Sequence, residues 1–260
     1  MKRKLLCGLL TAALLIQPTF AARRVQVQVD GDLLPIRSYV EQGTTYVPLR
    51  ALLDSFGGWN IDWDPQLRFA VASSDGNILT ADPAADTISI NENTYSGRVT
   101  VENGRTYVPL RLVANILGGS AVWDAYLDGA AVTSPGAEHD AEELYWLSRI
   151  ISAESRGEPL EGQIAVGNVV MNRVASAEFP NSIPSVIFDQ KNGVQFEPVS
   201  NGTVFHAPTD LSVTAAKQVL DGEVILADAL YFYAPALSQG VWINDNRTYF
   251  TTIGCHRFYL

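Results

Sequence analysis

Two helical patterns separated by a break lie at the centre of the second half of the chain, in residues 147–173. Before the break, apolar residues recur at helical spacing and predict a helix with one apolar face, formed by Leu144, Leu147, Ile150 and Ile151. Gly157 and Pro159 end that helix. An almost wholly apolar pattern then predicts a second helix over residues 160–174, whose narrow polar stripe consists of Glu161, Ala165, Asn168 and Asn172. We expect this stripe to face a partner group.

One acid shares the apolar face of the first helix. Glu154 projects between the directions of Leu147 and Ile150, shortly before the helix ends. Burial disfavours a charged carboxylate, and so does the negative end of a helix dipole, so we predict a raised pKa for Glu154. A carboxyl group with a raised pKa suits general acid catalysis. The structural alternative is that Glu154 only caps the helix or pairs with Arg156.

Shorter elements fill the rest of the second half. The pattern over residues 209–220 predicts a helix that begins at an Asp or Thr cap and ends at Gly222. A turn or hairpin is expected around Asn192 and Gly193, and the aromatic-rich segments 229–235 and 253–260 are expected to be extended. This order, with helices first and short strands later, predicts a mixed α+β domain.

The first half contains an internal repeat. TYVPLRALLDSFGG at residues 45–58 returns as TYVPLRLVANILGG at residues 106–119, an offset of 61 residues, and a Trp-Asp pair follows each copy. Each copy predicts alternating strands and a short helix that starts after a proline and ends at two glycines. The apolar positions of the helices are expected to form a core, in the first copy Leu49, Leu52, Leu53 and Phe56. The whole chain is therefore predicted to be a two-domain α+β protein with a duplicated first domain.

The ends of these patterns divide the chain into segments. A basic start, an apolar run over residues 5–16 and a small-residue cleavage pattern predict a secretory signal peptide over residues 1–21. The run is shorter than the ~20 residues that span a bilayer, so we expect export and no stable membrane insertion. Residues 24–134 form the predicted repeat domain, residues 135–141 a linker with Pro, Gly and charge, and residues 142–260 the second domain.

Charge and composition exclude several kinds of function. Loss of the signal would leave 15 Lys and Arg against 28 Asp and Glu, a net charge of −13, which disfavours nucleic-acid binding. Cys255 would be the only cysteine left, so no intramolecular disulfide is expected. Adjacent strand residues point to opposite faces, so Cys255 and His256 do not predict a nucleophile-base pair. Three scattered histidines without a paired His and acid motif predict no metal site, and no cofactor is expected.

The repeats resemble the stalk-like domain of exported bacterial proteins that is named after the N-terminal domain of copper amine oxidases. The TYVPLR and Gly-Gly marks carry this resemblance over roughly the first half of the mature chain. The resemblance implies spacing or wall association, and it does not imply copper because the region contains no histidine. Binding of glycan by this aromatic-bearing module is an alternative role.

The motifs of the second half together resemble the SleB/CwlJ cell wall hydrolase family, known for degrading spore-cortex peptidoglycan. They span about residues 143–259 and comprise the run over 147–173, QF at 195–196, YFYAP at 231–235, WI at 242–243 and the closing IGCHRF. The resemblance implies a lysozyme-like α+β fold and a lytic transglycosylase activity on peptidoglycan glycan strands. Its single catalytic glutamate matches Glu154 in AESRGE.

In the implied mechanism one carboxyl group is sufficient. Glu154 would protonate the oxygen between N-acetylmuramic acid and N-acetylglucosamine, and would then take the proton of the muramoyl 6-hydroxyl to give a 1,6-anhydro sugar. Hydrolysis by water activated at Asp189 or Glu197 is the alternative enzymatic mechanism. Glu158 and Glu161 lie in or after the break and are expected to be solvated surface acids.

Five further residues are candidate substrate contacts: Gln163, Asn172, Gln195, Phe196 and Tyr233. An unpaired amide at Gln163 would cost ~1 to 3 kcal/mol on the apolar side of its helix, so Gln163 orients Glu154 or a loop, or contacts sugar. Asn172 has an interhelical hydrogen bond as its alternative role. Gln195 and Phe196 follow a glycine turn and suit a cleft wall, as Tyr233 does, with ordinary packing as the alternative.

Two questions stay open at the level of sequence. A degenerate second domain held on the wall without catalysis is the non-enzymatic alternative, although the intact AESRGEPLEGQ segment disfavours decay. The chain carries stalk-like repeats in place of the dedicated peptidoglycan-binding repeat of a spore enzyme. The sequence is therefore as compatible with vegetative wall as with spore cortex as the substrate. The sequence indicates no particular accessory protein.

Overall fold

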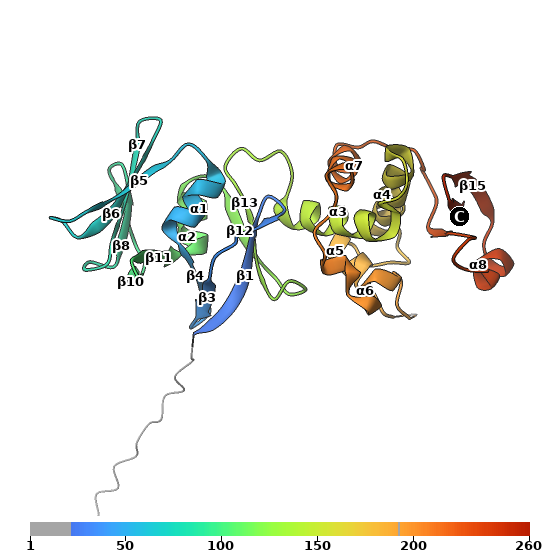
Figure 1. The fold of residues 1–260 in the computed structure, drawn as a ribbon, viewed down its shortest axis with the longest axis horizontal. Helices are drawn as coiled ribbons and strands as arrows, with labels where there is room; N and C mark the ends of the chain where they lie inside the picture. The colour runs from blue at the N-terminus through green and yellow to red at the C-terminus, as the bar shows by residue number, and fades with distance from the viewer. Residues whose placement is uncertain (1–21, 192) are drawn as a thin grey trace, which may run out of the picture.

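The computed structural model describes residues 22–191 and 193–260, so the predicted signal peptide and Asn192 of the predicted turn lie outside the described residues. Figure 1 shows a β-rich domain and a mainly helical domain arranged in a row along the longest axis. The predicted two-domain α+β organisation is confirmed. No helix in the described ranges is long and apolar enough to cross a bilayer.

The N-terminal domain contains two sheets. The larger one has the order β10-β11-β4-β3-β1-β13-β12 with β2 on β1, and its strands are β1 (Arg23–Val29), β2 (Asp32–Leu33), β3 (Ser38–Glu41), β4 (Thr44–Pro48), β10 (Thr100–Glu102), β11 (Arg105–Pro109), β12 (Ser120–Asp124) and β13 (Gly129–Thr133). The smaller sheet is a meander of β5 (Asn60–Asp64), β6 (Phe69–Ser74), β7 (Asn77–Asp82), β8 (Thr87–Ile90) and β9 (Asn93–Ser96).

The two repeats meet at strands β4 and β11. These strands pair antiparallel, and Val47 lies directly opposite Val108, its own counterpart at the repeat offset of 61 residues. Tyr46 pairs with Pro109 and Pro48 with Tyr107, so the contact is the same in both directions. The repeats are therefore related by a local two-fold axis, as two subunits of a symmetric dimer would be.

Each repeat contributes one short helix to a shared core. Helix α1 (Leu49–Phe56) follows Pro48 and α2 (Leu110–Ile116) follows Pro109, as the sequence predicts. The expected core positions of α1 are confirmed, because Leu49, Leu52 and Leu53 are at most 1% exposed and Phe56 packs partly buried beside them.

The C-terminal domain is built around three helices. Helices α3 (Ala141–Ser155), α4 (Leu160–Ala175) and α7 (Asp210–Leu220) pack against one another, and the Thr209 hydroxyl caps α7 by accepting the Ser212 N–H at 3.2 Å. The short helical segments are α5 (Ile183–Ile187), α6 (Glu197–Asn201), η1 (Thr203–Phe205) and α8 (Val241–Asn246). The predicted extended segments form a small sheet of β14 (Tyr231–Tyr233), β16 (His256–Tyr259) and β15 (Tyr249–Ile253).

Helix α3 lies where the two domains meet (Figure 1), and Leu127 of the N-terminal domain joins the hydrophobic core of the C-terminal domain. Buried Asp124, from the second Trp-Asp pair, accepts the indole N–H of buried Trp146 at 2.7 Å. Gln28 of β1 is fully buried and donates to the carbonyl oxygen of Ala141 at 2.9 Å. The ring of Tyr126 stacks on Phe188 with centroids 4.3 Å apart. Helix α3 therefore contacts the N-terminal domain as well as the rest of its own domain.

Candidate functional site

Glu154 is the penultimate residue of α3, immediately before the break that separates α3 from α4. The carboxyl group is partly buried and lines a cavity of about 260 Å³. Among the described residues no hydrogen bond or ion pair ties Glu154 to another side chain, so the alternative role as a partner of Arg156 finds no contact. The remaining lining comes from α3, α6, η1 and three loops: Arg149, Ser152, Ala153, Arg156, Glu197, Pro198, Asn201, Thr203, His206, Ala207 and Leu237.

The surroundings of Glu154 favour its protonated form. Burial, followed by the negative charge of Glu197, raises the pKa of Glu154 from 4.5 to about 7, and Arg173 acts in the opposite direction. The direction is the one expected from its helical position. A carboxyl group with a pKa near neutrality can both donate and accept a proton there.

Arg173 is the residue of this region that sequence reasoning missed. It is 4% exposed, its Nε donates to the carbonyl oxygen of Leu230 at 2.8 Å, and its guanidinium lies 4.9 Å from the ring centroids of Phe179 and Phe196. Burial lowers the pKa of Arg173 to about 10, and Tyr231 and Glu154 oppose that shift. A basic residue in an otherwise apolar helix was the available signal.

Glu197 and the wall beside it were placed only by the structure. Glu197 is the first residue of the five-residue helix α6, and Asn201, Thr203 and His206 follow along the same side of the cavity. A helix of one turn has no periodic pattern, so sequence alone does not bring these residues to Glu154. Glu197 is one of the two carboxylates named as alternative bases. The other, Asp189, accepts the Lys191 N–H at 3.0 Å within its own loop.

The structure places Gln163 and Asn172 in internal hydrogen bonds. Gln163 is fully buried, its Nε2 donates to the Glu158 carbonyl at 3.0 Å, and its Oε1 accepts the Ser212 hydroxyl at 2.7 Å. Asn172 donates to the carbonyls of Leu226 and Ala229, both at 3.0 Å. Both amides therefore hold loops and helices together. Full burial contradicts the prediction of Gln163 as a sugar contact, whereas for half-buried Asn172 the contact stays a prediction.

Gln195, Phe196 and Tyr233 do not join the cavity of Glu154. Phe196 is 2% exposed and packs in the core, which corrects its prediction as a cleft wall. Gln195 donates to the carbonyl of Gly193 at 3.1 Å, within its own turn. The Tyr233 hydroxyl accepts the amide N–H of Asn244 at 3.1 Å, on the surface of the small sheet.

Glu158 is not the solvated acid that the sequence predicts. Its side chain is only 9% exposed, and its Oε2 accepts the Cys255 N–H at 2.9 Å, because the turn between β15 and β16 closes over the α3-α4 break. Gly254 suits this contact because its φ is +56°, and because a Cβ there would displace the Glu158 carboxylate. Glu161, by contrast, is exposed as expected.

The remaining candidate chemistries find no built site in the described ranges. Exposed Cys255 lies in the turn, whereas His256 is buried and faces Glu158 Oε1 at 4.0 Å. No group of three or more His, Cys, Asp or Glu side chains suited to a metal ion occurs in residues 22–191 and 193–260.

Two family models match the chain, one in each domain. The Cell Wall Hydrolase family model matches residues 157–259, beginning three residues after Glu154. The Copper amine oxidase N-terminal domain model matches residues 28–129. Residues 28–129 include β2 to β12 and residues 157–259 include α4 to β16, whereas α3 lies just before the second of these ranges.

Curated and solved relatives cover the C-terminal half. The Spore cortex-lytic enzyme of Bacillus cereus is 32% identical over 120 residues, which are 46% of this chain and 45% of the relative. That of Bacillus subtilis is 32% identical over 131 residues, 50% of this chain and 41% of the relative. This chain thus spans less than half of either. The catalytic domain of the germination-specific lytic transglycosylase SleB from Bacillus anthracis is 32% identical and covered to 98%, with 47% of this chain covered and a TM-score of 0.43.

Proposed function

Because the second half of this chain belongs to the cell wall hydrolase family, we propose that the protein is an exported peptidoglycan-degrading glycosidase of the lytic transglycosylase type. The observation that carries the proposal is the placement of Glu154 in a cavity where burial and Glu197 raise its pKa to about 7. The names of the relatives, spore cortex-lytic enzyme and lytic transglycosylase, support the same chemistry.

Glu154 carries both proton transfers in the proposed mechanism. The protonated carboxyl group donates to the glycosidic oxygen between N-acetylmuramic acid and N-acetylglucosamine as the bond to C1 breaks. The resulting carboxylate takes the proton of the muramoyl 6-hydroxyl while that oxygen bonds to C1, so the 1,6-anhydro product forms and Glu154 is protonated again. Acid-base help of this kind contributes roughly 10²- to 10⁴-fold in rate. The negative charge of Glu197 would stabilise the positively charged, oxocarbenium-like transition state.

A hydrolytic muramidase is the second candidate, and the position of Glu197 favours it. Glu197 lines the same cavity as Glu154 and is exposed, so its carboxylate could activate a water. Mass spectrometry of digested peptidoglycan separates the two mechanisms. Products with 1,6-anhydro ends support the transglycosylase, whereas reducing muramic acid that carries ¹⁸O from labelled water supports hydrolysis.

The role of Glu154 is tested by Glu154→Gln, with Glu161→Gln as the matched control on an exposed acid of the next helix. We expect the first variant to lose at least about 10²-fold in rate and the second to digest as the native chain does. Full activity of Glu154→Gln would exclude the mechanism. A native chain that sediments with sacculi and releases no fragments would support the non-catalytic wall-binding alternative.

We also propose that the substrate is spore-cortex peptidoglycan, degraded during germination, with vegetative wall as the alternative. The support is the name shared by the curated relatives. Purified cortex and vegetative sacculi, digested side by side at equal muramic acid content, decide between them. Faster release from cortex is the expected result, and equal rates on both would remove the cortex assignment.

A further inference from the structure

The N-terminal domain contains two pockets that the internal repeat relates to each other. Their volumes are about 650 Å³ and about 490 Å³. Every residue that lines either pocket, except Arg23 in one and Ile36 in the other, has a counterpart in the second pocket at an offset of 60 or 61 residues. Each pocket combines the helix and tryptophan strand of one repeat with the hairpin of the other. The two-fold pairing of β4 and β11 therefore creates both.

An exposed tryptophan stands in each pocket. Trp123 is 40% exposed and Trp63 is 44% exposed, so neither indole belongs to the domain core. A duplicated fold repeats its hollows, but it does not require both copies to present a large apolar ring to solvent. Flat aromatic faces at the edge of a pocket with a few polar groups are suited to binding a ring-shaped ligand.

An arginine is fixed beside each tryptophan strand. Arg111 Nε donates to the carbonyl of Ala121 at 3.1 Å, and the equivalent Arg50 donates through Nη2 to the carbonyl of Ile61 at 2.6 Å. Within the described ranges neither guanidinium pairs with an acidic side chain. The remaining N–H groups of these anchored guanidinium groups are available to a ligand that carries acceptor oxygens.

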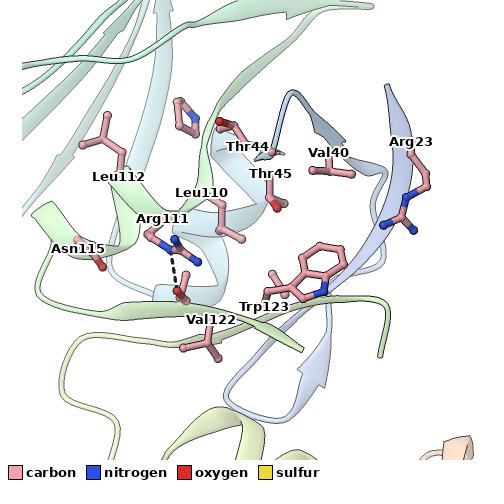
Figure 2. A pocket seen from close by; sticks show the side chains of 14 residues that line it. Arg23, Val40, Thr44, Thr45, Leu110, Arg111, Leu112, Asn115, Val122 and Trp123 are labelled. Carbon is pink, nitrogen blue, oxygen red and sulfur yellow. Dashed lines mark hydrogen bonds between the residues drawn. The ribbon is translucent and has the colours of Figure 1, made fainter. Parts of the chain in front are cut away.

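The two pockets differ in charge. Arg111, Arg23 and Asn115 line the pocket of Trp123 and no acidic residue does, although the whole chain has a net charge of −10. Arg23 is paired with Asp128 outside the lining, so Arg111 is the cation of this pocket that no described acid neutralises. Figure 2 shows the indole of Trp123 between the guanidinium groups of Arg111 and Arg23, facing the strand of Thr44 and Thr45. Arg23 lies 5.7 Å from the indole centroid. This pocket is therefore suited to an anionic ligand.

The pocket of Trp63 contains equal numbers of basic and acidic side chains, so its lining is not cationic. It contains two arginines, Arg50 and Arg105, and two acids, Asp54 and Asp62. Of these four charged residues, the other pocket keeps only the equivalent of Arg50, and it has Thr44, Asn115 and Val122 in place of Arg105, Asp54 and Asp62. Paired donors and acceptors around an aromatic face suit the hydroxyl groups of a neutral sugar.

We propose that the two pockets bind the glycan strand of peptidoglycan, with one sugar ring lying on each indole. The Trp123 pocket takes N-acetylmuramic acid, whose lactyl carboxylate, where no peptide is attached, faces Arg111. The Trp63 pocket takes an uncharged N-acetylated sugar. Pockets of this size accommodate one or two sugar rings. The identity of the glycan rests on the proposed function, whereas the presence of two related sugar pockets rests on the geometry alone.

The test measures binding of the full chain and its variants to insoluble sacculi and to soluble glycan strands from which an amidase has removed the peptides. Trp123→Ala and Trp63→Ala are each expected to weaken binding about tenfold, and the double variant more, since one stacked ring contributes on the order of a factor of ten. Arg111→Gln is expected to weaken binding to the stripped strands more than Arg50→Gln does. Leu67→Ala is the matched control, because Leu67 is 61% exposed in the same domain and lines neither pocket.

Each outcome has a definite meaning. Native binding by the double tryptophan variant, with an unchanged melting temperature, would overturn the inference, and so would loss of binding when peptides are stripped. Binding that depends on the tryptophans in a chain that releases no fragments would keep the pockets and reject the proposed activity. Efficient cleavage by a chain whose binding does not depend on the tryptophans would keep the proposed activity and reject the pockets.

Discussion

A carboxyl group whose pKa is raised in the folded state couples catalysis to stability. Burial and Glu197 raise the pKa of Glu154 from 4.5 to about 7, so the folded chain holds this proton more tightly than the unfolded chain does. The stabilising contribution is fully present below pH 4.5 and is lost as the pH rises through 7. Glu154 thus weakens the fold at the alkaline side of neutrality, as functional residues often do.

Glu154→Gln is therefore expected to stabilise the chain at pH 8 and to leave its stability nearly unchanged at pH 5. At pH 8 the variant removes a partly buried negative charge beside Glu197, which is worth on the order of 2 kcal/mol. Thermal unfolding at both pH values measures the difference, with Glu161→Gln as the exposed control. An equal gain at both pH values would contradict the raised pKa.

Arg173 is the positive group that limits the pKa of Glu154. Arg173→Gln removes that charge, so the pKa of Glu154 should rise further and the alkaline limb of the activity profile should move to higher pH. Arg173→Lys retains the charge and should keep the limb near its native position. Both variants also lose part of the bond to Leu230 and should be less stable by ~1 to 3 kcal/mol, so a shift of the limb in both would reject the electrostatic role.

At the scale of elements, the polar stripe of α4 holds a loop rather than a ligand. Asn168 donates to the Glu223 carbonyl at 2.8 Å and accepts the N–H groups of Ile225 and Leu226 at 2.8 and 3.1 Å. We expect Asn168→Ala to cost about 2 kcal/mol, because three backbone groups lose their partner. Urea unfolding measures this, with Glu161→Ala as the control from the same stripe. A cost below about 0.5 kcal/mol would mean that water replaces the amide.

Periodic patterns in the sequence predicted the long helices. They did not predict contacts between residues that are distant in sequence. Helices α4 and α7 begin and end within one residue of their expected bounds, because their apolar spacing and caps are local signals. The burial of Glu158 was mispredicted since its partner, Cys255, is 97 residues away. Phe196 was taken for a cleft wall for the same reason: an aromatic residue after a glycine turn has no local signal that distinguishes core from surface.

At the scale of the molecule, one repeat motif serves two purposes. In both copies the Trp-Asp aspartate caps the following turn: Asp64 accepts the Leu67 N–H at 2.9 Å and Asp124 the Leu127 N–H at 3.0 Å. Only the second copy meets the C-terminal domain, so Leu127 is 7% exposed where Leu67 is 61% exposed. The second Trp-Asp copy, together with Gln28 of β1, thus holds the helix that carries Glu154.

The junction should make the two domains unfold together. Trp146→Phe removes the indole donor to buried Asp124 and leaves a small cavity, so we expect a loss of ~2 to 4 kcal/mol. A double-mutant cycle with Asp124→Asn isolates the hydrogen bond, for which a coupling of ~1 to 3 kcal/mol is expected. Asp64→Asn is the matched control, because it weakens the same turn in the copy of the motif that does not contact the C-terminal domain.

Calorimetry gives the second readout for the same variants. The native chain should unfold in one transition, since the buried Asp124-Trp146 bond and the stacked pair of Tyr126 on Phe188 must break before either domain opens at this face. Trp146→Phe should split that transition into two, and Asp64→Asn should shift it without splitting it. Two well-separated transitions in the native chain would mean that the junction carries little free energy, and the position of Glu154 would then depend on the C-terminal domain alone.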